Sequence, residues 1–349
     1  MKGFKKIILW TLIPITLELL GIFYIDQFYL NDETSFNTKK IDVATKKGPS
    51  KINVKVGDEA KNIKASYNGK YISYYEDESI KVVDTSNNKK KEITFEDGGK
   101  LSSYKWLPDR DIMLVAEKYS NGNLGNYLKF KSYNAKKDEK LPLSDENNKE
   151  LKIPLLDGKY EVLDIALSTA TNVTYVKVGR EGVRSKLYRI NVMAQLEETK
   201  YYNGKLGEIT ALNKEDRLVY QDVTYNRIRV VGLKNPIATG ENAIHYLLAS
   251  DSEDSVYIGN GEDEKVKKIF VASLKKPREQ WKILTLEERV NKGNIYITNK
   301  GKIYINEPSK SLVKDLESGQ EVQYEGEVVE IHDFGIIVKD GGKISGKLF

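Results

Sequence analysis

The chain has no cysteine, which excludes disulfide bridges, thiolate metal sites and a cysteine nucleophile. Its only histidines are His245 and His332, too few to favour a histidine-rich metal site or a Ser-His-Asp triad. The 56 basic and 51 acidic residues are mixed along the sequence, and no run of like charge is longer than that of Lys89–Lys91. A basic stripe for nucleic acid is therefore not indicated, and no cofactor is expected.

One long apolar run is present, at residues 7–25 (IILWTLIPITLELLGIFYI). As a helix rising ~1.5 Å per residue it would span roughly 28 Å, close to the thickness of the hydrocarbon core of a bilayer. Lys2, Lys5 and Lys6 precede it and acidic residues follow, so we expect the N-terminus in the cytoplasm and the rest outside. The bulky stretch DQFYLNDET lacks the small residues of a cleavage site, which favours an uncleaved anchor over a cleaved signal peptide.

Glu18 lies inside this apolar run. An acidic group near the centre of a bilayer costs ~2.5–3.5 kcal/mol on insertion scales. Glu18 either snorkels or is protonated, or else it faces a polar group on the helix of a membrane partner. The sequence thus predicts a cytoplasmic tail (1–6), a single-pass transmembrane anchor (7–25), a polar stalk (26–50) and an extracytoplasmic domain (51–349).

The domain shows short strands with alternating apolar and polar residues, and no sustained helical pattern. Apolar strands recur about every 40 residues, with one longer step, which is typical of a β-propeller. They begin at Tyr71, Ile112, Val173, Arg217, Ser255, Ile295 and Gly335. We therefore predict an all-β, seven-bladed β-propeller, with six blades as the alternative. The longer step contains a charged insertion, residues 134–159, which we place between the second and third blades.

Gly341–Lys347 fits the opening of a phosphate-binding loop, G-x-x-x-x-G-K. Such a loop needs Ser or Thr after the lysine and then a helix, but Leu348 and Phe349 follow here. KISGKLF instead alternates like a strand, and DGGK recurs at residues 97–100, as a turn would. We predict that KISGKLF is the third strand of blade seven and that KINVKV, ending at Val56, supplies the outer strand and closes the ring.

The segment YKWLPDRDIMLVAEK resembles the W-s-P-D-G blade signature of TolB-like and dipeptidyl-peptidase IV-type propellers. Trp106, Pro108 and Asp109 match this signature, whereas Leu107 and Arg110 stand where the family prefers a small residue and glycine. The resemblance implies a propeller fold over residues 51–349. It implies no activity, because propellers support binding and catalysis alike.

Catalytic candidates are limited to carboxylates near strand ends, most of which we interpret as solvated turn residues. They are Asp164, Asp222, Asp251, Glu253, Asp254 and Asp333. His332 and Asp333 are the residues expected to face a central channel, whereas His245 is expected to pack in a strand.

The leading hypothesis is a membrane-anchored, extracytoplasmic, non-enzymatic binding or scaffold module of a cell-envelope or exopolysaccharide assembly or secretion complex. Its partners would be a membrane protein that contacts Glu18 and a polysaccharide or peptide ligand. The alternatives are an enzyme that processes carbohydrate or peptide with channel carboxylates, and a ligand-sensing accessory of a transporter or signalling system.

Overall fold

The computed structural model describes residues 14–22, 24, 52–121, 125–202 and 204–349. The chain divides into two units, Met1–Lys46 and Lys47–Phe349. In the first unit, residues 14–22 are helical and exposed, Glu18 among them. Across the described ranges, no helix has the length and apolar character needed to cross a membrane. Residues 7–13, 23 and 25 of the predicted anchor, and the predicted stalk at residues 26–50, lie outside the described residues.

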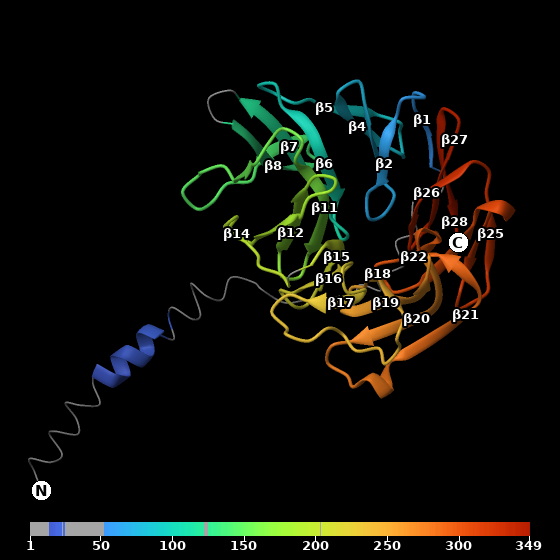
Figure 1. The fold of residues 1–349 in the computed structure, drawn as a ribbon. Coiled ribbons are helices and arrows are strands. Elements are labelled where there is room, and N and C mark those ends of the chain that lie inside the picture. Colours follow the sequence, from blue (N-terminus) through green and yellow to red (C-terminus); the bar gives the residue numbers. More distant parts are fainter. Residues whose placement is uncertain (1–13, 23, 25–51, 122–124, 203) are drawn as a thin grey trace, which may run out of the picture. The chain divides into compact units, whose positions relative to one another are not determined.

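The second unit consists of seven antiparallel sheets arranged around one axis (Figure 1). We number them as blades 1 to 7 in chain order and give the strands from the axis outward. Blade 1 contains β2 (Lys61–Ala65), β3 (Tyr71–Glu76), β4 (Ser79–Asp84) and β5 (Lys90–Ile93). Blade 2 contains β6 (Lys100–Trp106), β7 (Ile112–Asn121), β8 (Gly125–Asn134) and an outer edge shared by β9 (Glu139–Pro142) and β10 (Lys152–Leu155). Blade 3 contains β11 (Glu161–Ser168), β12 (Val173–Gly179), β13 (Lys186–Ile190) and β14 (Leu196–Glu198).

Blade 4 has three described strands, β15 (Leu206–Ala211), β16 (Leu218–Asp222) and β17 (Arg227–Val230). Blade 5 contains β18 (Ile244–Ser250), β19 (Ser255–Glu262), β20 (Lys265–Ser273) and β21 (Lys282–Asn291). Blade 6 contains β22 (Ile295–Ile297), β23 (Ile303–Glu307), β24 (Leu312–Asp315) and β25 (Glu321–Gln323). Blade 7 contains β26 (Glu327–His332), β27 (Gly335–Asp340), β28 (Lys343–Leu348) and β1 (Asn53–Lys55). Three 3₁₀ turns, η2 (Arg278–Gln280), η3 (Lys292–Asn294) and η4 (Pro308–Lys310), lie between strands of blades 5 and 6.

The core is divided among the seven contacts between neighbouring blades. One cluster of buried apolar side chains lies at each contact, from blades 1 and 2 round to blades 7 and 1. Strand alternation explains this division, because successive side chains point to opposite faces of a sheet and each face meets another blade. Middle strands are buried on both faces, as the fully buried run of β16 shows. Many of the tyrosines serve these contacts; Tyr74, Tyr104 and Tyr304 are among the largest fully buried side chains.

The ring closes as the sequence predicts. β1 pairs antiparallel with β28, with Val54 opposite Ile344, so the outer strand of blade 7 comes from the start of the domain. The backbone N–H of Val56 donates to the carbonyl of Gly342 at 2.9 Å. Gly341 and Gly342 form the turn between β27 and β28, and Gly341 has a φ of 52°, which favours glycine. The G-x-x-x-x-G-K match is therefore a hairpin, as predicted.

Two details of the repeat differ from the prediction. The strand that begins at Ile295 is the innermost strand of blade 6, whereas the other six predicted strands are second strands. β22 has only three residues and, like β23, begins with the sequence IYI, so its pattern does not show which of the two is the second strand. The charged insertion also lies within blade 2 rather than between blades: β9 and β10 both pair with β8, and residues 143–151 loop out between them.

Candidate functional site

The two faces of the propeller are defined by its turns. Turns from first to second strands lie on one face. The chain enters β1 from that side, because β1 runs from Asn53, opposite Ser345, to Lys55, opposite Lys343, which lies beside the β27–β28 turn on the other face. We call this the entry face. The far face carries the turns from second to third strands and the connections between blades.

The first strands surround the axis, and six of the seven contain a register shift. Such bulges bend a strand and redirect its side chains. In every blade, one residue of the first strand pairs with the third residue of the second strand, so these first-strand residues occupy equivalent positions around the ring. In blades 3 to 6 this residue is apolar; in order they are Ala166, Ile209, Ala249 and Ile295. In blades 7, 1 and 2 it is charged: Glu330, Lys64 and Lys105.

These three charged side chains, with Asp164 of blade 3, form what we call the inner charged row. Each of the first three reaches toward the next blade. Glu330 Oε2 accepts the backbone N–H of Ala65 at 2.7 Å. The Lys64 ammonium lies 5.5 Å from the ring centroid of Tyr104. Lys105 donates to the carbonyl oxygen of Ile165 and lies 3.8 Å from Asp164 Oδ1.

Lys64 differs from the other members of the row. Among the described residues, no carboxylate lies within ion-pairing distance of its ammonium. Burial lowers the pKa of Lys64, and the nearby positive charge of Lys105 lowers it further, while Glu330 and Asp164 oppose the change. A desolvated ammonium held by an aromatic face can donate three hydrogen bonds to an incoming anionic or carbonyl group.

His332 and Asp333 lie at the entry-face end of blade 7. His332 Nε2 is 3.0 Å from Glu330 Oε2, and its ring stacks on Phe334 at 5.0 Å between centroids. The histidine thus adjoins the inner charged row. Asp333 lies in the turn that follows, and its buried Oδ1 has no hydrogen-bond partner among the described residues.

The other predicted carboxylates are dispersed in blades 4 and 5 and hold turns or blades in place. Asp251 accepts the backbone N–H of Ser255 and the hydroxyl of Tyr257, each at 2.9 Å. Asp254 accepts the backbone N–H of Asn213 in blade 4 at 2.6 Å. Asp222 forms a buried ion pair with Arg229, and the exposed Glu253 pairs with Lys214.

His245 is a buried strand residue, as predicted. Arg227 Nη1 donates to its Nδ1 at 3.3 Å, so its Nε2–H donates to Thr239 Oγ1. Burial lowers the pKa of His245, and the charge of Arg227 lowers it further. These contacts keep the imidazole neutral and assign it to the blade 4–5 contact.

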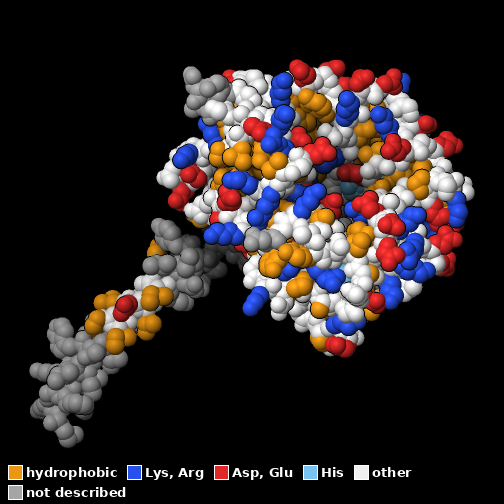
Figure 2. All heavy atoms as spheres, in the orientation of Figure 1, with side chains coloured by type: hydrophobic (Ala, Val, Ile, Leu, Met, Phe, Trp, Pro, Cys, Tyr) orange, Lys and Arg blue, Asp and Glu red, His pale blue; other side chains and the backbone are white. Residues whose placement is uncertain are grey.

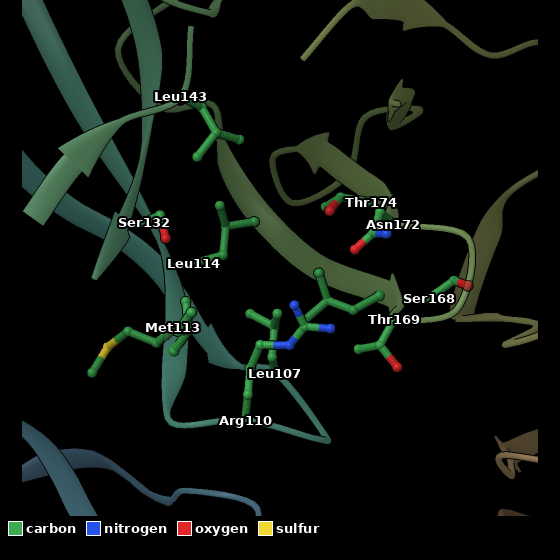
Figure 3. Close-up of a pocket in the computed structure, with 12 residues that line it drawn as sticks. Leu107, Arg110, Met113, Leu114, Ser132, Leu143, Ser168, Thr169, Asn172 and Thr174 are labelled. Atoms are coloured by element: carbon green, nitrogen blue, oxygen red, sulfur yellow. The ribbon is translucent and has the colours of Figure 1, made fainter. Parts of the chain in front are cut away.

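A cavity of about 240 Å³ opens between the entry-face turns of blades 2 and 3. Figure 3 shows hydroxyl and amide side chains of the β11–β12 turn on one side, among them Thr169 and Asn172, and the aliphatic Leu114 and Leu143 on the other. Arg110 reaches between them, with its Nε and Nη2 bound to Asp109 at 2.9 and 2.8 Å. Leu143 begins the loop that interrupts the outer edge of blade 2.

No protein-family model matches the sequence, and no curated protein matches it. The fold is similar to the β-propeller domain of Myceliophteria thermophila Cps50 (Swd1), with a TM-score of 0.55 at 9% identity, covering 86% of this chain and 99% of that one. A structure of a prolyl endopeptidase has a TM-score of 0.51 at 14% identity and covers 76% of this chain and 42% of that chain. The chain is a seven-bladed β-propeller.

At these identities the likeness shows the fold alone. The seven-bladed fold that the Trp106-Leu107-Pro108-Asp109 segment suggested is confirmed, whereas the resemblance to one type of propeller stays a prediction. Neither neighbour explains the inner charged row, which sequence reasoning also missed apart from Asp164 and the adjacent His332 and Asp333. The sequence of the half-exposed strand KNIKA does not indicate that ring closure brings its Lys64 near Glu330.

Proposed function

We propose that the propeller is a non-enzymatic binding module that receives an anionic or carbonyl group of its ligand at Lys64. The observation that carries this proposal is the inner charged row. In it, Glu330 and Lys105 are hydrogen-bonded to protein backbone, while Lys64 has no carboxylate partner in the part of the chain that the structure describes. The dispersed carboxylates of blades 4 and 5, engaged in turns and blade contacts, favour binding over hydrolysis.

We further propose that the module is held outside the cytoplasm by a single-pass anchor at residues 7–25. The basic residues before this run and its apolar length support this placement. In the same proposal, Glu18 contacts a polar group of a membrane partner, since a carboxyl at that depth needs compensation. A module of this kind suits a cell-envelope or exopolysaccharide assembly or secretion complex, with a polysaccharide or peptide as ligand; a sensing accessory of a transporter would use the same surface.

The experiment is crosslinking in cells, followed by purification of the protein and mass spectrometry of what accompanies it. Lys64→Met should lower recovery of the ligand or partner at least ~10-fold, equivalent to about 1.4 kcal/mol. The matched control is Lys61→Met, on the same strand, whose exposed ammonium faces Glu59 at 3.9 Å. Methionine can fill the lysine's space without a charge, so both variants should melt like the wild type. Full recovery with Lys64→Met would remove the proposed binding role.

Glu18→Leu is the matching test of the anchor. Leucine inserts more favourably than glutamate, so insertion should persist while copurification of a membrane partner falls. Retention of every partner at wild-type yield would show that Glu18 is tolerated in the anchor and does not bind.

A second candidate is an enzyme that processes carbohydrate or peptide, favoured by the 3.0 Å contact between His332 and Glu330. A carboxylate beside a histidine can support general acid–base chemistry. This candidate predicts that purified protein releases product from an oligosaccharide or peptide and that Glu330→Gln abolishes the release.

A further inference from the structure

Two tyrosines of blade 4 lie exposed on the far face, away from the inner charged row. Tyr202 precedes β15 and is 50% exposed, and Tyr225 lies in the β16–β17 turn and is 51% exposed. Their ring centroids are 5.8 Å apart at an interplanar angle of 69°. Figure 2 shows hydrophobic side chains gathered among basic ones over the part of the propeller where Figure 1 draws blade 4.

The Tyr202 ring is supported from beneath by a buried ion pair. The Arg229 guanidinium carbon lies 3.9 Å from the Tyr202 centroid, and Arg229 Nε donates to Asp222 Oδ2 at 2.9 Å. The side chains of Arg229 and Asp222 are only 9% and 1% exposed. Desolvating two charges is costly, and an apolar pair of similar size would stabilise the fold at least as well.

Asp222 of the same ion pair also binds the backbone of Tyr225, and the neighbouring Tyr220 binds the backbone of Tyr202. Asp222 Oδ1 accepts the backbone N–H of Tyr225 at 3.3 Å, and the backbone N–H of Tyr202 donates to the hydroxyl of Tyr220 at 3.1 Å. Arg229 Nη1 donates to the carbonyl oxygen of Lys234 at 3.4 Å. Scattered exposed apolar residues are normal on proteins, but these two are held in place by a desolvated network.

We propose that Tyr202 and Tyr225 form an aromatic platform that binds a saccharide. An aromatic face carries partial negative charge and attracts the polarised C–H groups of an apolar ligand face. Pyranose rings whose hydroxyl groups are all equatorial present such a C–H face, so the platform suits β-linked glucose or N-acetylglucosamine units. Two rings near a right angle form no parallel groove of the kind that holds an extended proline-rich peptide, which favours the saccharide.

This inference goes beyond the proposed function, because it adds a second binding surface and names the class of ligand for that surface. The far face lies opposite the side from which the chain enters the propeller. Because the platform and Lys64 lie on different surfaces of the propeller, Tyr202 and Lys64 variants separate the two proposals.

The test is saturation-transfer NMR with cellohexaose and chitohexaose as probes on the purified propeller domain. We expect saturation of the sugar C–H protons by the wild-type domain for at least one hexaose, and at least ~10-fold weaker binding by Tyr202→Ala and by Tyr225→Ala. The control is Leu233→Ala, an apolar residue of the same blade, 46% exposed, in the entry-face turn that follows β17. It should bind like the wild type.

Melting curves accompany each variant, because an exposed ring can be truncated without loss of fold. Three results would overturn the platform: no saturation of either hexaose by the wild-type domain, unchanged binding by both folded tyrosine variants, or binding of a proline decamer that the tyrosine variants abolish. Loss of binding by Lys64→Met with both tyrosine variants unaffected would assign the sugar to the inner charged row instead.

Discussion

A propeller domain that starts at Gly57 is expected to melt about 10 °C below one that starts at Lys51. The shorter domain lacks β1 and with it Ile52 and Val54, which are 3% and 1% exposed in the cluster between blades 7 and 1. Loss of two buried aliphatic side chains costs ~4–10 kcal/mol by analogy with large-to-small core substitutions. The edge of β28 would also be left unpaired, which invites aggregation.

Differential scanning calorimetry of the two purified domains measures this effect. The control is removal of residues 31–48 from the full chain, which should leave the melting temperature unchanged, since β1 is retained. Equal melting temperatures for the domains starting at Lys51 and Gly57 would show that β1 contributes nothing to closure.

Glu117→Leu is expected to lower the free energy of unfolding by about 3–5 kcal/mol. Glu117 in β7 is fully buried, and its carboxylate lies 3.3 Å from both Lys131 and Lys140 and accepts the Tyr119 hydroxyl at 2.6 Å. Removing the shared anion leaves two lysines, with side chains only 12% and 17% exposed, without their buried partner. Urea unfolding of the purified domain gives the free energy.

The matched control is Glu150→Gln in the outer edge of the same blade. Glu150 pairs with Lys129 at 2.6 Å but is 37% exposed, so its loss should cost less than ~1 kcal/mol. If Glu117→Leu proves as mild as this control, the buried cluster is not a stabilising network.

The parts of the fold that the sequence predicts are those specified locally. Alternating strands and polar turns predict seven blades, and the alternation of KISGKLF and KINVKV predicts the closure by β1. The W-x-P-D segment is informative because Trp106 serves a blade contact: its Nε1 donates to Ser73 Oγ at 2.8 Å and its ring stacks on Tyr71.

The sites are harder to predict because their members meet only after ring closure. Ala65 and Glu330, which form a hydrogen bond, are separated by 265 positions. Glu117 stands in the strand IMLVAEK, where one charge after five apolar residues reads as the strand's exposed end. The short β22 and the outward loop of blade 2 are also predicted wrongly, but here the local signal itself is weak. A strand of three residues, or one interrupted by a loop, shows too little alternation to be assigned its position in the blade.

Labelling of a single introduced cysteine on intact cells tests most directly the claim that this propeller binds its ligand outside the cytoplasm. The chain has no cysteine of its own, so Glu146→Cys, in the exposed loop between β9 and β10, provides a unique thiol. A membrane-impermeant maleimide should label Glu146→Cys on intact protoplasts, while Lys2→Cys should be labelled only after lysis. Labelling of Glu146→Cys only after lysis would place the propeller in the cytoplasm and contradict the proposed function.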